Sequence, residues 1–166
     1  MSSLERQVEG RKEAKRAVEL TISFPSSHPT PLPTRGRATK LSASSDGSKL
    51  VYTNDKTVVL RDPRQLSASA TYTQHNSPAT LARLSPSGYY VASADTSGTV
   101  RIWDVAGTEQ VLKIEMKGCL GGKVNDLAWD AESKRVIAVG EGRERSVQLV
   151  SFSFRLPGEL EGPTGV

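Results

Sequence analysis

The chain has 166 residues, of which 36% are hydrophobic and 24% charged, so it can form one domain or at most two small ones. No stretch approaches the ~20 consecutive apolar residues of a membrane-spanning helix. A single cysteine excludes a disulfide framework, and with two histidines it leaves no basis for a metal site of imidazoles and thiolates. The net charge of +4 lies within residues 1–40, because the remainder holds fourteen basic and fourteen acidic residues. A nucleic-acid-binding domain carries positive charge on its folded body, so nucleic acid is not the expected partner.

Residues 1–36 form a basic, proline-rich leader and linker outside the expected core. Residues 1–24 alternate acidic and basic side chains around a thin apolar stripe, which is compatible with a short solvated helix and too weak for membrane binding. The four glutamates argue against a transit peptide, and no apolar signal core is present. Residues 25–36, PSSHPTPLPTRG, contain four prolines and predict an extended linker.

From residue 37 the pattern changes to short β-like runs separated by turn residues. Many short strands with turn signals every ~8–12 residues predict an all-β sandwich or propeller. The expected strands are 50–54, 56–62, 81–84, 89–94, 99–103, 124–129, 135–139 and 147–152. We therefore take residues 37–145 as the folded body and 146–166 as a divergent strand followed by a Gly/Pro-rich tail.

An internal repeat decides between the sandwich and the propeller. Gly47 aligns with Gly88 at an offset of 41 residues, and Gly88 aligns with Ser133 at an offset of 45. A period of ~40–45 residues is that of WD-repeat propeller blades, so we expect about three blades of an incomplete propeller. The aligned segments are SDGSKLVYT (45–53), SPSGYYVAS (85–93) and AESKRVIAV (131–139).

The middle repeat carries the signature of a WD repeat. TVRIWD (99–104) ends in the dipeptide Trp103-Asp104, His75 lies 28 residues before Trp103, and Ser93 lies ten before it. These positions resemble the structural network in which His, Ser, Asp and Trp hydrogen-bond across a WD-repeat blade. We therefore expect structural roles for these residues.

Elsewhere the signature is incomplete. The network's aspartate usually precedes the tryptophan by six residues, where this chain has Ser97, and the sequence leaves open whether Asp95 replaces it. The first repeat has Arg-Asp at 61–62 in place of Trp-Asp, and the third has Val-Ser at 150–151.

The body also resembles one particular family. TQHNSPATLARLSPSGYYVASADTSGTVRIWD (73–104) and KVNDLAWDAESKRVIAVGEGRER (123–145) resemble the amino-terminal blades of the actin-interacting protein family, and residues 32–54 resemble its start. The resemblance covers about two thirds of the chain. It implies a non-enzymatic protein of two linked seven-bladed propellers that binds cofilin-decorated actin filaments and promotes their disassembly. It also implies a cytoplasmic location on the actin cytoskeleton.

The run GEGRER is the expected contact with actin and cofilin. The resemblance assigns that contact to Glu144, with Arg143 and Arg145 as neighbouring contact residues. A solvated turn is the alternative interpretation of these charges. Charged loops on a rigid β scaffold are a usual place for recognition.

The ends of the chain depart from the family. Residues 1–31 have no evident counterpart, and the pattern diverges after Arg145. Three blades cannot close a ring, so we expect exposed apolar side chains at Val136, Ile137 and Leu149. Exposed apolar faces and open blade edges promote pairing, so we also expect self-association of the isolated chain.

Two alternative functions stay open: a generic WD-repeat scaffold for another complex, and a truncated gene product without function. An enzyme is not supported, because no nucleophile motif accompanies His75 and GCLGG (118–122) lacks the phosphate-loop spacing. The cysteine in that run is taken as structural. Asp126, near Asp130 and Glu132, is expected to close a turn or pair locally, so no cofactor or metal is expected.

Overall fold

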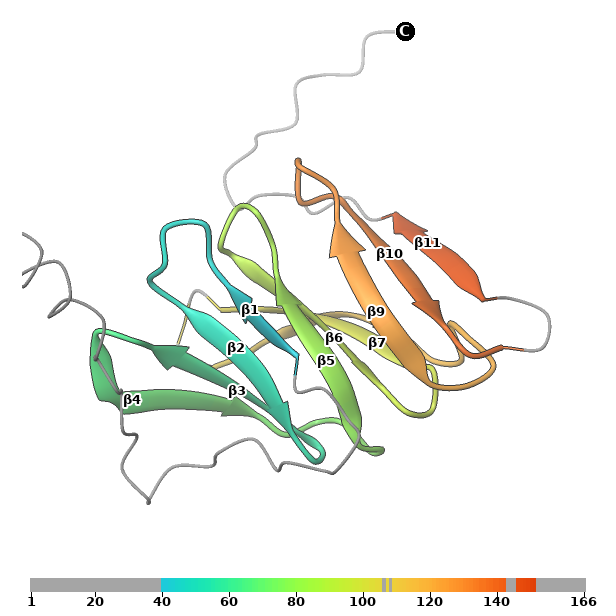
Figure 1. Ribbon diagram of the computed structural model, residues 1–166, viewed down its shortest axis with the longest axis horizontal. Helices are drawn as coiled ribbons and strands as arrows, with labels where there is room; N and C mark the ends of the chain where they lie inside the picture. The colour runs from blue at the N-terminus through green and yellow to red at the C-terminus, as the bar shows by residue number, and fades with distance from the viewer. Residues whose placement is uncertain (1–39, 106, 108, 143–145, 152–166) are drawn as a thin grey trace, which may run out of the picture.

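The computed structural model describes residues 40–105, 107, 109–142 and 146–151, which form three antiparallel β-sheets (Figure 1). The first sheet has the strand order β1-β2-β3-β4, the middle sheet β5-β6-β7-β8 and the third sheet β11-β10-β9. The all-β blades predicted from the sequence are confirmed. The strands are β1 (Leu41–Ala43), β2 (Leu50–Asn54), β3 (Thr57–Asp62), β4 (Gln65–Tyr72), β5 (Ala79–Leu84), β6 (Tyr90–Asp95), β7 (Val100–Asp104), β8 (Leu112–Met116), β9 (Val124–Trp129), β10 (Arg135–Gly140) and β11 (Val147–Ser151). Within the described residues there is no helix of the length and apolarity that crossing a membrane requires.

Each sheet begins with a hairpin that turns on a residue of positive φ. These residues are Gly47, Gly88 and Ser133, with φ of 68°, 74° and 59°, and they are the positions that the repeat aligned. Glycine adopts this conformation at no steric cost, whereas serine adopts it at a cost. The repeat is therefore a repeat of turn geometry, and the third turn retains it without the glycine.

The core consists of two layers, one on each face of the middle sheet. Successive side chains of a strand point to opposite faces, so neighbouring residues of β7 enter different layers. The layer shared with the first sheet contains Val51, Val58, Leu60, Tyr72, Ala82, Leu84, Val91, Trp103 and Val105. The layer shared with the third sheet contains Leu81, Ala92, Ala94, Val100, Ile102, Cys119, Leu120, Val124, Leu127, Val136, Ala138 and Val150.

The first strands of the three sheets, β1, β5 and β9, lie side by side (Figure 1). Ser42 Oγ accepts a hydrogen bond from the Leu84 amide at 3.2 Å. The Trp129 indole donates to the Arg83 carbonyl at 3.0 Å. Polar contacts between side chains and the backbone therefore join each sheet to the next.

Asp126 also links two sheets. It forms ion pairs with Arg83 at 2.9 Å and with Lys40 at 3.5 Å, and it accepts a local hydrogen bond from the adjacent Leu127 amide at 3.0 Å. The expectation that Asp126 pairs locally is therefore wrong for its ion pairs. The Arg83 guanidinium that pairs with it lies on the middle sheet, whereas Asp126 lies on the third.

The third sheet has one covered face and one exposed face. Val136 is fully buried against the middle sheet, so the expectation that it is exposed is wrong. Ile137 and Leu149 lie opposite each other in register and are 43% and 53% exposed, as predicted. A shift of one residue along a strand reverses the face, which explains the different burial of Val136 and Ile137.

One close approach between loops depends on a glycine. The β6–β7 turn reaches the loop before β9, where the Leu120 amide donates to the Gly98 carbonyl at 3.4 Å. Gly98 has φ of 82°, and a Cβ at this position would lie 2.1 Å from the Leu120 carbonyl oxygen. No other residue type fits there without movement of the backbone.

Candidate functional site

A buried chain of hydrogen bonds links the middle sheet to the loop before it. The His75 ring lies 3.0 Å from Asp95 through Nδ1 and 2.8 Å from Ser93 Oγ through Nε2. Trp103 Nε1 donates to the same Ser93 oxygen at 3.1 Å. All four side chains are buried. One proton arrangement satisfies them: Nδ1–H donates to Asp95, the Ser93 hydroxyl donates to Nε2, and the indole donates to Ser93.

Asp95 supplies the carboxylate of this network. Its Oδ1 accepts from the Ser97 amide and hydroxyl at 2.9 and 2.6 Å and from the Thr99 amide at 3.1 Å. Burial acts to raise the pKa of Asp95, but the hydrogen bonds from Ser97 and His75 outweigh it and lower the pKa. Asp95, two residues before Ser97, thus supplies the carboxylate that the usual spacing assigns to position 97. Ser97 is connected to the network through its hydrogen bonds to Asp95.

The His75 ring is held in its neutral form. Burial lowers its pKa because the charged ring is poorly solvated there, and the hydrogen bond to Asp95 offsets only part of this effect. Ser93, His75 and Asp95 have the connectivity of a nucleophile, base and orienting acid. Ser93 is nevertheless fully buried and its oxygen already accepts from Trp103, so it faces no space for a substrate. The arrangement fixes the blade and offers no exposed nucleophile.

Aromatic and charged side chains surround the network. Tyr72 stacks on Trp103 with ring centroids 4.6 Å apart, and it meets the His75 ring edge-on at 5.9 Å. The buried Arg101 pairs with Glu115, with Nε 3.0 Å from the carboxylate, and it also donates to the Gln74 carbonyl. The first sheet is therefore tied to the middle sheet around Trp103.

Asp104 lies outside the network, contrary to the role expected for it. Its carboxylate pairs with Lys113 Nζ at 3.0 Å and accepts from the Val111 amide at 3.1 Å. Asp104 thus fastens the start of β8 to the end of β7. The two residues of the Trp-Asp dipeptide point to opposite faces of the strand, so only Trp103 can reach Ser93.

The same pair of positions is filled differently in each sheet. In the middle sheet it is Ser93 and Trp103, joined by a hydrogen bond. In the first sheet the Arg61 Nε donates to the Tyr52 hydroxyl at 2.8 Å. In the third sheet the corresponding residues, by the strand register, are the apolar Ala138 and Val150. In the first two sheets one residue of the pair donates a hydrogen bond to the other. In the third sheet both residues are apolar, so neither a donor nor an acceptor is left unpaired.

The loops at one end of the sheets are joined by backbone hydrogen bonds. The Ala79 amide donates to Asp55 at 2.7 Å, and the Glu141 amide donates to Lys123 at 2.8 Å. At the end of β10 the Gly140 amide donates to the Ser146 carbonyl at 2.9 Å, which brings together the residues on either side of 141–145. Glu144, Arg143 and Arg145 lie outside the described residues. Their described neighbours Gly140, Glu141 and Ser146 are held by backbone hydrogen bonds.

The remaining candidates form no chemical site. No group of three or more His, Cys, Asp or Glu side chains within the described ranges could hold a metal ion. Asp130 accepts from the Lys134 and Arg135 amides of its own turn, and Asp126 is paired with Arg83, so these two carboxylates bind separate partners. Cys119 is buried, and burial raises the pKa of its thiol.

Comparison with known protein families shows to which class of protein the chain belongs. Residues 67–104 match the family model described as "WD domain, G-beta repeat", and this segment contains every residue of the buried network. Together with the repeated antiparallel sheets of four, four and three described strands, the match identifies a WD-repeat protein.

The relatives narrow the class to one family. The chain is 44% identical over 132 residues to actin-interacting protein 1 of Caenorhabditis elegans, covering 80% of this chain and 21% of that protein. It is 39% identical over 129 residues to actin-interacting protein 1 of Drosophila melanogaster, covering 77% and 21%. It is 43% identical over 111 residues to WD repeat-containing protein 1 of Xenopus tropicalis, covering 67% and 18%. The chain belongs to this actin-interacting family of WD-repeat proteins, and it spans about a fifth of the length of these relatives.

Proposed function

We propose that this chain binds actin filaments and takes part in cofilin-assisted filament disassembly, as a non-enzymatic protein of the cytoplasmic actin cytoskeleton. The observation that carries the proposal is the identity of 39–44% with relatives named actin-interacting protein 1. The buried Ser93 supports a binding role over a catalytic one, because the triad-like arrangement has no access to substrate. The neutral body of the chain is also compatible with a protein partner.

The proposed contact is Glu144, with Arg143 and Arg145 beside it. Support comes from the described residues on either side of them: the Gly140 amide at the end of β10 donates to the Ser146 carbonyl, just before β11. Backbone hydrogen bonds also join the neighbouring loops at this end of the sheets. A rigid scaffold lowers the entropy lost on binding, and charges at such a surface set orientation and association rate.

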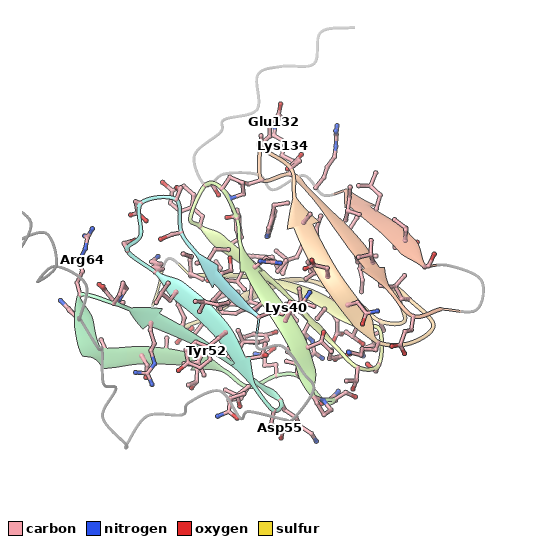
Figure 2. The ribbon with its side chains drawn as sticks, viewed as in Figure 1. Lys40, Tyr52, Asp55, Arg64, Glu132 and Lys134 are labelled. Atoms are coloured by element: carbon pink, nitrogen blue, oxygen red, sulfur yellow. The ribbon has the colours of Figure 1, made fainter. Side chains whose placement is uncertain are left out.

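Cosedimentation with actin filaments tests the proposal. The full chain should pellet with cofilin-decorated filaments and should pellet less with bare filaments. Glu144→Ala should weaken the pelleting and slow disassembly. Glu132→Ala is the matched control, because Glu132 is an exposed glutamate on the β9–β10 turn, at the opposite end of β10 (Figure 2).

Two results would contradict the proposal. If the chain pellets with neither kind of filament, it is a scaffold for another complex or a product without this function. If Glu144→Ala and Glu132→Ala reduce pelleting equally, the contact does not involve the GEGRER loop. The circular dichroism spectrum of each variant shows whether the fold is kept.

A further inference from the structure

The strand β4 forms an outer edge of the first sheet. Within the described residues it is paired only with β3, and it lies at the border of the fold (Figure 1). It spans eight residues, and a shift of register opposite Arg61 and Asp62 leaves residues 69–72 as its regularly paired stretch. Alternate residues of such an edge direct their N–H and C=O groups outward, away from the paired strand.

This edge lacks the charged residues that usually protect an edge strand. Natural edges are blunted by charged side chains, prolines, β-bulges or short length. The sequence of β4, QLSASATY, has no charge and no proline. The edge strand β8 shows the contrast, because it carries Lys113 and Glu115, both in ion pairs.

A groove adjoins the carboxyl end of β4. It has a volume of about 370 Å³ and lies between this end of β4 and the beginning of β8. Its lining is mixed: Thr, Gln and Glu side chains stand beside the apolar Val111 and Leu112 and the ring of Tyr72. Glu109 is its one charged residue, is exposed, and forms no ion pair with another described residue. The lining residues are Thr71, Tyr72, Thr73, Gln74, Glu109, Gln110, Val111 and Leu112.

We propose that β4 and this groove bind an extended segment of a partner protein, which adds a strand to the sheet and carries a lysine or arginine toward Glu109. Outward backbone groups along β4 require a ligand with regularly spaced donors and acceptors, which an extended peptide supplies. The mixed, open lining suits a peptide better than a small apolar ligand. The carboxylate of Glu109 selects for a basic side chain.

A second copy of this chain fits the site less well. In a pairing of two β4 strands, the incoming side chains would include Ala68, Ser69, Ala70 and Thr71. These are small and uncharged, so they would neither fill the groove nor neutralise Glu109. The site is also distinct from the GEGRER loop, since its residues come from β4 and from the β7–β8 connection.

Peptide selection on the full chain tests this proposal. A phage-displayed library of random heptapeptides should yield binders rich in β-branched residues with one Lys or Arg. N-methylation of alternate amides in a synthetic binder should reduce affinity more than about tenfold, because it removes the backbone donors. Thr71→Lys should reduce affinity by at least about tenfold, because it places a charge on the edge. Glu109→Lys should weaken binding about three- to fivefold, the effect of an exposed ion pair.

The control variant is Asn76→Lys, which adds the same charge at an exposed position outside the groove and should bind as the unchanged chain does. The proposal is overturned if no peptide is enriched, or if the enriched peptides bind Thr71→Lys and Glu109→Lys as well as the control. Binding that survives N-methylation would exclude strand addition. Concentration-dependent dimerisation abolished by Thr71→Lys would assign the edge to a second copy instead.

Discussion

Replacing Ser93 by alanine tests the buried network directly. The Ser93 oxygen receives the Trp103 indole N–H at 3.1 Å and its hydroxyl reaches His75 Nε2 at 2.8 Å. Alanine removes the hydroxyl, so His75 Nε2 and Trp103 Nε1 are left buried without a partner. Each unsatisfied buried polar group costs about 1–3 kcal/mol, so we expect a loss of about 2–4 kcal/mol in the free energy of unfolding. This is a large fraction of the ~5–15 kcal/mol that stabilises a typical domain.

Urea unfolding followed by tryptophan fluorescence measures this loss. Ser97→Ala is the matched control, because its hydroxyl also belongs to the network, through Asp95, but the side chain is exposed. Water can replace that hydroxyl, so we expect a loss of about 1 kcal/mol or less. The reasoning is refuted if Ser93→Ala is no more destabilising than Ser97→Ala. If Ser93→Ala lowers the free energy of unfolding by less than about 0.5 kcal/mol, His75 Nε2 and Trp103 Nε1 find other partners.

Three further measurements address other parts of the fold. The pKa of His75 is lower in the folded chain than in the unfolded chain, so the unfolded chain takes up the proton first as the pH falls. Stability should therefore be lost below about pH 6.5. The urea midpoints at about pH 7.5 and 5.5 should differ less in His75→Asn than in the unchanged chain. Gly98→Ala should cost more than about 3 kcal/mol, because its Cβ would lie 2.1 Å from a carbonyl oxygen, whereas Gly47→Ala, with open space around its Cβ, should cost about 1–2 kcal/mol; equal losses would show that the loops move apart readily. Sedimentation velocity of the full chain should show concentration-dependent association that Leu149→Lys reduces, and a monomer at all concentrations would contradict a role for the exposed face of the third sheet.

The buried network shows how far the sequence could predict the site. Spacing alone placed His75, Ser93 and Trp103 in one blade, and the structure joins them by hydrogen bonds. The spacing rule pointed to Ser97 for the carboxylate, but the β6–β7 turn brings Asp95 to the ring instead. A turn can deliver a carboxylate from a neighbouring position, and its exact geometry is not encoded in spacing.

The strands that the sequence did not reveal have a common cause. Residues of β4, QLSASATY, are mostly small and polar, and β8 alternates charged with apolar residues over only five positions. Strands with such sequences form because a neighbouring strand offers hydrogen bonds, not because their own residues favour extension. The short β1 was missed for the same reason, since it pairs with β2 over only three residues.

By itself, the sequence determined the all-β class, the repeat of about three sheets and the family, because turn glycines, strand periodicity and the Trp-Asp pair are local or regularly spaced features. Only the tertiary structure decided that Asp126 pairs with Arg83 across two sheets, that Val136 is buried while Ile137 is exposed, and that Asp104 stands apart from the network. These outcomes depend on which faces meet when the sheets pack. That choice is made by contacts between residues about 40 positions apart, which no local pattern specifies.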